Sequence, residues 1–582
     1  MELISQKMRK KAPELDPLRI GTGWTKEDLD KAQIIIESTF GDSHPGSGHL
    51  DKLVEQVRKG VADEGGHGAR YFCTDICDGE SQGTDGINYS LVSREIIADM
   101  IEIHENATPF DGGVFLSSCD KGMPGTLIGM ARVNIPSLVV TGGTMSAGPN
   151  LLTLEQLGRY NARYERGEID EKTFNWAKCN ACPGCGACSF IGTASTMQIM
   201  AEALGFALPG SALLPANSPD LLAYAYESGR QSVRLVRAGI KPSDIICQKS
   251  FENAILVHAA ISGSTNALLH LPALAHEYGI EITGETFDKL HRGTHYLLNL
   301  RPTGKWPAEF FYYAGGVPAI MEEIKSILHL DVMTVTGKTL GENLEELKNN
   351  GFYEKCQNWL DMTNEKYGLS LKKEDIIHPY DNPIGKEGSI AVLKGNLAPE
   401  GAVIKHTACP EEMFEAVLRA RPFDSEEECL EAVLHHQVQK GDAVMIRYEG
   451  PRGSGMPEMF YTSEAISSDA DLGRNIALIT DGRFSGASTG PVIGHCSPEA
   501  TEGGPIALVE EGDLIYINIP ERRLEIVGIE GKRCSREDIE KILEERRLRW
   551  KRPAKKYKQG VLRMFSEHAT SPMKGAYMDF ND

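Results

Sequence analysis

The chain has 582 residues, and 82 Asp and Glu outweigh 61 Lys and Arg to give a net charge of -21. This length exceeds what one hydrophobic core normally serves, so at least two domains are expected. The acidic balance argues against nucleic acid as a partner, because neutralising phosphates requires a concentrated basic face. No apolar run is long enough to span a membrane and no secretion signal is apparent, which predicts a cytoplasmic protein. Thirteen cysteines then indicate metal binding or simple burial rather than a disulfide framework.

The first 370 or so residues alternate short apolar runs with helical patterns. Thr25 and Asp28 form a capping-box pattern, which predicts a helix through "LDKAQIIIESTF" (29–40). Further on, "VFLSS" (114–118), "GTLIGMARV" (125–133) and "SLVVTGG" (137–143) have the order strand, helix, strand. We therefore predict an N-terminal α/β domain with a mostly parallel sheet, over residues 1–375.

The character of the sequence changes between about residues 373 and 400, where Pro, Gly and Asn are dense and helical periodicity is weak. Beyond this boundary, short β-like runs separated by turns occur at 441–450, 475–486 and 512–529. They predict a C-terminal domain, residues 376–582, built as a β-barrel or sandwich. A charged helix over 535–550 is expected to close the chain, and the basic run 546–558 is interpreted as a solvated helix end.

The cysteines carry the clearest chemical signal. Cys179, Cys182, Cys185 and Cys188 have overlapping CxxC spacings, which are typical of a metal or cluster site, and a structural zinc site on these four is one interpretation. Two other cysteines each precede an aspartate, in the pairs Cys77-Asp78 and Cys119-Asp120. Thiolates suit iron–sulfur or zinc whereas carboxylates suit magnesium, so these pairs suggest two different metals close together. The alternative is that the two Cys-Asp pairs occur in their loops by chance and hold no metal.

Seven motifs extend this signal along the chain and resemble, in the same order, those of the dihydroxy-acid and 6-phosphogluconate dehydratases. They are "CDGESQGTDGINYSLVSREIIADM", "SSCDKGMPGTLIGMA", "CSFIGTASTMQIMAEALG", "HAAISGSTNALLHLPALAHE", "LDVMTVTGKTLGENL", "YEGPRGSGMPEM" and "ITDGRFSGASTGPVIGHCSPEA". The likeness covers about residues 40 to 510. Within the family, the sequence is most similar to the bacterial D-xylonate dehydratases. It implies an N-terminal α/β domain and a C-terminal β-barrel-like domain with the site between them.

The resemblance implies an iron–sulfur cluster. Cys119 and Cys188 match cluster ligands, but Gly46 stands where the 2Fe-2S members carry a third cysteine. Cys77 is the natural replacement, which favours a 4Fe-4S cluster over 2Fe-2S, and Cys185 is the competing third ligand.

The resemblance also implies a magnesium site. Asp78, Asp120 and Glu458 match its ligands, and Lys121 matches a lysine that is carbamylated in relatives, where it also acts in catalysis. A surface ion pair is the alternative role for Asp120 and Lys121. Ser485 matches the family's proposed base, although a serine in a glycine turn is more often an ordinary turn residue.

Four further residues have open roles. His49 and His495 are expected to be structural, with contact to substrate as the alternative. Thr193 and Ser195 lie at the expected start of a helix, where backbone N–H groups favour an anion or a thiolate sulfur; the alternative is that the two residues are helix caps.

The function that the resemblance implies is hydro-lyase chemistry, the dehydration of a sugar acid such as D-xylonate to the 2-keto-3-deoxy acid with an iron–sulfur cluster and Mg²⁺. A dihydroxy-acid dehydratase of branched-chain amino acid biosynthesis is the alternative. A non-catalytic iron–sulfur or zinc protein that senses redox state is a second alternative. Relatives form homodimers or dimers of dimers, so a homodimer or homotetramer acting on a small molecule is expected.

Overall fold

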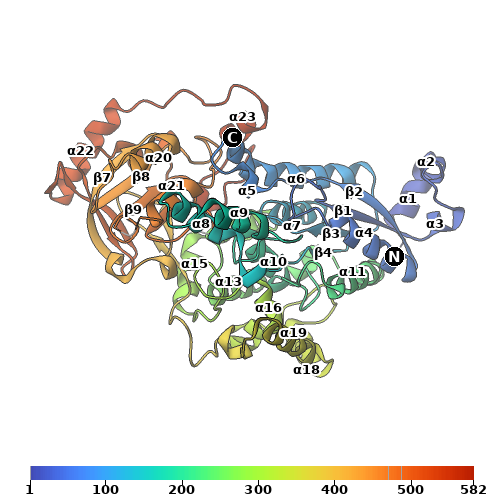
Figure 1. Cartoon of the computed structure of the whole chain (residues 1–582). Helices are drawn as coiled ribbons and strands as arrows, with labels where there is room; N and C mark the ends of the chain where they lie inside the picture. The colour runs from blue at the N-terminus through green and yellow to red at the C-terminus, as the bar shows by residue number, and fades with distance from the viewer. Residues whose placement is uncertain (1, 470, 487, 582) are drawn as a thin grey trace.

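The N-terminal region of the computed structural model is built on a four-stranded parallel sheet of order β2-β1-β3-β4 (Figure 1). The structure describes residues 2–469, 471–486 and 488–581. The strands are β1 (Ala32–Ser38), β2 (Gly66–Phe72), β3 (Gly112–Ser117) and β4 (Ser137–Thr141). Helix α7 (Gly122–Val133) connects β3 to β4. The predicted strand–helix–strand unit and the parallel sheet are therefore confirmed.

The helix predicted to follow Thr25 is much shorter than expected. The capping box between Thr25 and Asp28 is present, but α3 ends at Asp30 and β1 begins at Ala32. Ile34, Ile35 and Ile36 are fully buried in β1, with neighbouring strands on both sides. Burial on both faces of a parallel strand produces a continuous apolar run, and here it overrides the local helix signal.

Pairs of helices cover the two faces of this sheet. Helices α4 (Leu50–Asp63) and α11 (Pro219–Ala238) pack together on one side, and α6 (Tyr89–Ala107) and α7 pack together on the other (Figure 1). A Cβ on Gly60 of α4 would stand 1.9 Å from the Tyr226 carbonyl oxygen, so only glycine permits this close helix contact.

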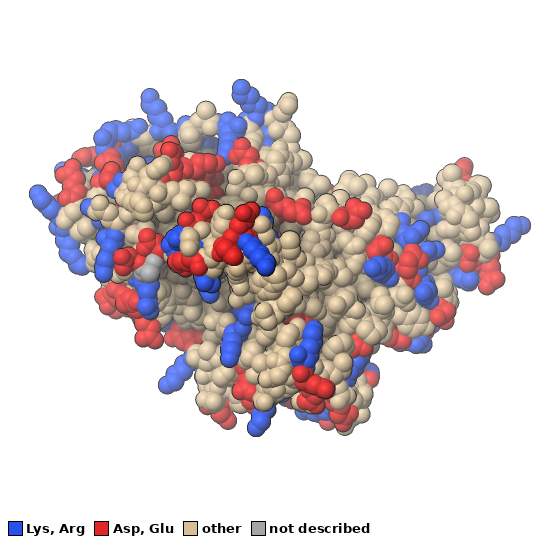
Figure 2. All heavy atoms as spheres, viewed as in Figure 1, with Lys and Arg blue, Asp and Glu red and all other residues tan. Residues whose placement is uncertain are grey.

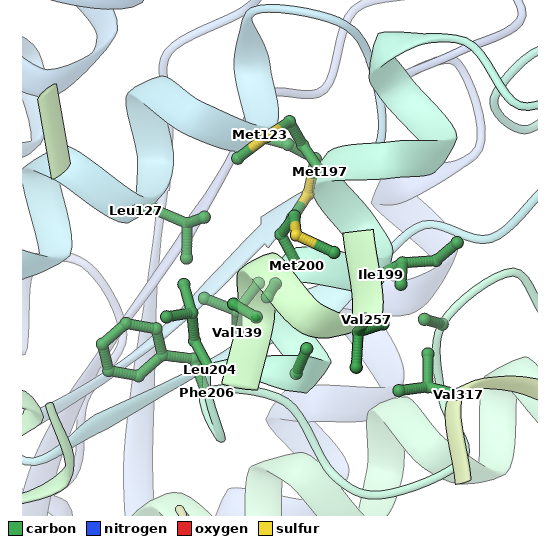
Figure 3. Close-up of a cluster of buried hydrophobic side chains, with 14 of the residues drawn as sticks. Met123, Leu127, Val139, Met197, Ile199, Met200, Leu204, Phe206, Val257 and Val317 are labelled. Carbon is green, nitrogen blue, oxygen red and sulfur yellow. The ribbon is translucent and has the colours of Figure 1, made fainter. Parts of the chain in front are cut away.

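The largest core lies where the sheet meets a group of buried helices. Figure 3 shows Met123 and Leu127 of α7 and Val139 of β4 facing Met197 and Met200 of helix α10 (Thr193–Ala203). The helices that complete this core are α10 (Thr193–Ala203), α13 (Gln248–Ile261), α14 (Ala267–Glu277), α16 (Glu309–Tyr313) and α17 (Gly316–Glu323). Every residue of α10 is buried, which makes its N-terminus a rigid support for the loops around it.

The remaining helices are mostly peripheral. They are α1 (Ile4–Lys11), α2 (Leu15–Gly21), α3 (Lys26–Asp30), α5 (Asp78–Ser81), α8 (Leu157–Glu165), α9 (Glu171–Asn180), α12 (Pro242–Ile245), α15 (Gly284–Arg292), α18 (Leu340–Asn349), α19 (Phe352–Tyr367), α20 (Glu426–Leu434), α21 (Phe460–Ser467), α22 (Arg536–Arg549) and α23 (Gly560–His568). Within the described residues, no helix combines the length and apolar character needed to cross a bilayer.

The C-terminal region contains a mixed sheet of nine strands in the order β13-β12-β11-β7-β8-β9-β10-β6-β5. The strands are β5 (Ile390–Leu393), β6 (Gly401–Lys405), β7 (Glu415–Phe423), β8 (Asp442–Ile446), β9 (Ala477–Thr480), β10 (Val492–Ser497), β11 (Leu514–Asn518), β12 (Arg523–Ile529) and β13 (Lys532–Arg533). The sheet curls until the backbone of Lys394, just after β5, pairs with Arg523 of β12. This near-closure confirms the predicted barrel-like sheet, which encloses a second core.

The C-terminal end differs from the prediction in two respects. Helix α22 does not close the chain, because α23 follows and the tail returns to the N-terminal region, where Arg94 Nη2 donates to the Ala576 carbonyl oxygen at 2.9 Å. The basic run is also not wholly solvated, because Arg546 is buried and paired with Asp513. Elsewhere, acidic and basic side chains are interspersed over the face that Figure 2 shows.

Candidate active site

A cavity of about 1150 Å³ brings together residues from both regions of the chain. All but one of the site residues predicted from the sequence line it, and the exception, Lys121, is fully buried directly behind the wall. The lining members of the predicted set are Cys77, Asp78, Cys119, Asp120, Cys188, Glu458 and Ser485. Residues separated by some 400 positions in the sequence therefore face one space.

The segments that follow the carboxyl ends of β2 and β3 supply five of the eight predicted residues. Strand β3 ends at Ser117, and Cys119, Asp120 and Lys121 follow directly before α7 begins. In parallel sheets, ligand sites form at this edge. The turn is tight, because a Cβ on Gly122 would stand 2.2 Å from Asp75 Oδ2.

Three carboxylates form the acidic part of the site. Asp78, Asp120 and Glu458 each place one oxygen within 4.8 Å of the other two. Lys121 Nζ donates to Asp78 Oδ2 at 3.0 Å and to Asp120 Oδ2 at 2.5 Å, and Arg483 Nη1 donates to Glu458 Oε1 at 2.5 Å. Asp78 Oδ1 is buried and has no hydrogen-bond partner in the structure. A divalent cation is the ligand that such an oxygen cluster suits.

The charges in this cluster strongly perturb one another. Burial raises the pKa of Glu458 to about 7 despite the opposing effect of Arg483, and burial also raises the pKa of Asp120. Burial acts in the same direction on Asp78, but Lys121 and Arg483 outweigh it, so the pKa of Asp78 is lowered. Burial and Arg483 oppose the charge on Lys121, yet the surrounding carboxylates leave its pKa raised. The cluster is thus held together by mutual neutralisation of largely buried charges.

The thiols form the other part of the site. Cys77 and Cys119 share a hydrogen bond, which with other contacts lowers the pKa of Cys77 to about 7 and raises that of Cys119. Burial raises the pKa of the Cys188 thiol, and Cys77 adds to this effect. A Cβ on Gly46 would stand 2.8 Å from Cys119 Sγ, so the early glycine loop faces this thiol as the resemblance implies. These donors, soft thiols beside hard carboxylates, fit an iron–sulfur cluster next to a divalent cation.

The other three cysteines of the CxxC run, Cys179, Cys182 and Cys185, do not line this cavity. Cys179 and Cys182 are exposed, and Cys185 is absent from the lining of the cavity that Cys77 and Cys188 share. In the described part of the chain, the only group of three or more closely spaced ligating side chains is the carboxylate cluster. The zinc site on Cys179, Cys182, Cys185 and Cys188 therefore gains no support from the arrangement of the described side chains, and it stays a prediction.

Two residues of the site were missed by sequence reasoning. Arg483 is fully buried; besides Glu458, its guanidinium reaches Ser90 Oγ at 2.9 Å and lies 3.6 Å from Asp78 Oδ2. Asn266 Nδ2 donates to Glu458 Oε1 at 2.6 Å. Both stand inside motifs already noted, so the arginine two positions before Ser485 was an available signal.

The four residues with open roles, His49, Thr193, Ser195 and His495, lie at different places relative to the cavity. His49 bonds to the Gly142 carbonyl oxygen at 2.6 Å and lies outside the cavity lining, as expected of a structural histidine. Thr193 and Ser195 line the cavity at the start of α10, but the N-cap of this helix is Gly192, so neither is its cap. His495 lies behind Ser485, in a separate small cavity.

Comparison with known proteins identifies the family. Two family models match, described as dihydroxy-acid/6-phosphogluconate dehydratase N-terminal over residues 31–343 and C-terminal over residues 375–576. The chain belongs to this dehydratase family. It is accordingly an enzyme of the hydro-lyase class, which sets aside the alternative of a non-catalytic redox sensor.

Individual relatives of this dehydratase agree in name. A dihydroxy-acid dehydratase of Caldanaerobacter subterraneus is 42% identical over 564 residues, or 95% of each chain. The dihydroxy-acid dehydratase 1 of Methanosarcina acetivorans is 42% identical over 96% of each chain, and the enzyme of Ruminiclostridium cellulolyticum is 40% identical over 99% of each chain. The predicted likeness to D-xylonate dehydratases is not confirmed, and these names favour the alternative.

Proposed function

We propose that this dehydratase removes water from a 2,3-dihydroxy acid with a branched apolar chain and forms the 2-keto acid. The observation that carries this proposal is the single cavity shared by the thiols, the carboxylate cluster and Ser485. Cys77 and Asp120 come from the N-terminal side of the boundary proposed near residue 375, and Glu458 and Ser485 from the C-terminal side.

The apolar walls of the cavity support this choice of substrate. A sugar acid needs a hydrogen-bond partner for each remaining hydroxyl group, because unpaired polar groups are penalised heavily in a closed site. Away from the carboxylates, much of the wall is instead apolar, with Leu154, Leu157, Phe174, Phe190, Val433 and Phe460 among its members. Methyl groups of a branched chain suit such a surface.

The donor sets indicate which residues would hold the metals. Cys77, Cys119 and Cys188 would hold the cluster, and we favour 4Fe-4S because Gly46 offers no thiol. Asp78, Asp120 and Glu458 would hold Mg²⁺, and the unpartnered Asp78 Oδ1 fits this assignment. Lys121 would add an oxygen ligand after carbamylation, because its amine already reaches both aspartates. When bound, these groups supply Lewis acidity at the carboxylate and hydroxyl groups of the substrate.

The protein's own residues then have separate tasks. Ser485 Oγ takes the C2 proton; the electron pair of that C–H bond forms the C2–C3 double bond as the C3–O bond breaks, and the resulting enol tautomerises to the 2-keto acid. Arg483 keeps Glu458 and Asp78 in place through its buried contacts. The apolar side chains of the wall offer water no hydrogen-bond partners, which favours its displacement when a substrate fills the cavity.

The experiment that tests the proposal is an anaerobic assay of four substrates side by side: 2,3-dihydroxyisovalerate, D-xylonate, L-arabinonate and D-gluconate. We expect kcat/KM for 2,3-dihydroxyisovalerate to exceed that for each sugar acid by about 100-fold or more. A sugar acid that is dehydrated faster would overturn the substrate assignment while leaving the hydro-lyase class intact.

A further inference from the structure

A second, much smaller cavity lies directly behind Ser485. Its volume is about 20 Å³, which is enough for about one water molecule. Ser485, Ser488, Thr265, His495 and Lys405 are among the residues that line it, so polar groups surround the space. We call it the rear chamber. It has no role in the chemistry described so far.

Lys405 is the unusual member of this chamber. It is the last residue of β6, it is buried, and its Nζ donates to the Ser262 carbonyl oxygen at 2.7 Å. Buried lysines are normally paired with a carboxylate, but among the described residues no carboxylate pairs with Lys405, whose amine bonds to a backbone carbonyl instead. Burial alone lowers the pKa of Lys405 to about 7. Near pH 7 the neutral and the charged amine are therefore both populated, and the neutral form can accept a proton.

The other titratable groups around the chamber cannot take this role. Both ring nitrogens of His495 lack hydrogen-bond partners, and burial with the nearby Arg483 charge lowers its pKa to about 3. His258, on α13, also interacts electrostatically with Lys405, and burial lowers its pKa to about 4. His406, the next residue along the chain, has a pKa lowered by burial as well. Near pH 7 all three imidazoles are neutral and weakly basic, which leaves the Lys405 amine as the strongest base facing the chamber.

We infer that Lys405 is the proton acceptor for Ser485, acting across the rear chamber through one water molecule. This inference rests on the proposed function, in which Ser485 takes the C2 proton. Lys405 acts through Ser485 and does not touch the substrate, so it is a positioning residue in the proton path.

The proton balance closes over one turnover. The Ser485 hydroxyl proton passes through the chamber water to the lone pair of Lys405 Nζ, which becomes an ammonium. The resulting Ser485 oxygen takes the C2 proton as the C3 hydroxide leaves. That hydroxide receives the proton stored on Lys405, by way of Ser485, and departs as water. Lys405 is then neutral again and no external acid or base is consumed.

The test compares Lys405→Met with Lys405→Arg in the metal-loaded enzyme. Met removes the amine and keeps the length, whereas Arg keeps a donor for the Ser262 carbonyl but does not lose its proton at any working pH. We expect both variants to lower kcat for 2,3-dihydroxyisovalerate by about 10²- to 10⁴-fold with little change in KM. Lys394→Met, at an exposed lysine paired with Glu285, is the control and should match the wild type.

The pH profile separates proton transfer from a structural role. Wild-type kcat should rise with pH through about 7 as Lys405 loses its proton, and this acidic limb should be missing from Lys405→Met. A Lys405→Arg variant with full activity, or a Lys405→Met variant that keeps both its kcat and the limb, would overturn the inference. Iron content and thermal unfolding of each variant establish that it is loaded and folded.

A readout independent of turnover is the titration of Lys405 itself, followed by NMR of the protein labelled with ¹⁵Nζ-lysine. The Lys405 signal is identified as the one that is missing from the spectrum of Lys405→Met. A transition near pH 7 supports the inference, whereas an ordinary value of about 10.4 contradicts it. If the wild type fails to dehydrate 2,3-dihydroxyisovalerate, the proposed substrate is wrong. If the wild type succeeds and Lys405→Met equals it, only the role of Lys405 is wrong.

Discussion

Gly46 offers a sharp test of where the cluster is held. A Cβ at this position would stand 2.8 Å from Cys119 Sγ and 3.0 Å from His44 Nδ1. Both neighbours are buried, and His44 is held by Asp75 at 3.0 Å, so the ring cannot easily move aside. Gly46→Ala should therefore displace the Cys119 thiol.

The expected size of the effect follows from overpacking a dense interior, which costs about 1–3 kcal/mol. If this cost falls on the thiol, it equals about a 5- to 150-fold loss in affinity for the cluster. Gly79→Ala is the matched control, because its Cβ would stand at an ordinary 3.6 Å from Cys77 Sγ.

The assay is iron and acid-labile sulfide per chain after anaerobic reconstitution, with the visible absorbance of the cluster as a second signal. We expect a large loss in Gly46→Ala and none in Gly79→Ala. Equal iron content in wild type and Gly46→Ala would refute the placement of the cluster at Cys119.

Three further predictions follow from the same geometry. Cys77→Ser should lose iron and sulfide whereas Cys185→Ser should retain both, and the reverse pattern in the same iron and sulfide assay would move the third ligand to Cys185. Ser485→Ala should keep its iron content but lower kcat about 10²- to 10⁴-fold in a 2-keto acid assay, and unchanged kcat would remove Ser485 as the base. Burial raises the pKa of Glu105 to about 8, above its unfolded value, so this carboxyl makes the folded protein lose stability as pH rises from about 4.5 to 8. In Glu105→Gln, the free energy of unfolding measured with urea should fall less steeply with pH, by about 1.4 kcal/mol per pH unit. If the free energy of unfolding of the variant depends on pH as that of the wild type does, Glu105 is not the group responsible.

Much of the fold was predictable from sequence because its signals are local. The run from Val114 to Gly143 alternates strand, helix and strand patterns, and the structure has that order. The prediction failed at residues 29–40, where burial of Ile34 to Ile36 between two strands outweighed a genuine capping box. It failed again at Arg546, whose partner Asp513 is 33 residues away and leaves no local trace.

The candidate site shows the same division. The predicted thiols and carboxylates were found through motifs, and the structure gathers them around one cavity. The network that organises them depends on contacts over long distances in the chain, such as Arg483 with Ser90 and Asn266 with Glu458. A single sequence gives residue types and spacing, but it does not give the folding of the two regions against each other.

The most direct test of the central claim is anaerobic crystallography of the loaded enzyme with anomalous scattering at the iron edge. The account predicts an iron signal bounded by Cys77, Cys119 and Cys188, beside cation density at Asp78, Asp120 and Glu458. Iron bound instead by Cys179, Cys182 and Cys185, or a cation remote from the iron, would contradict it.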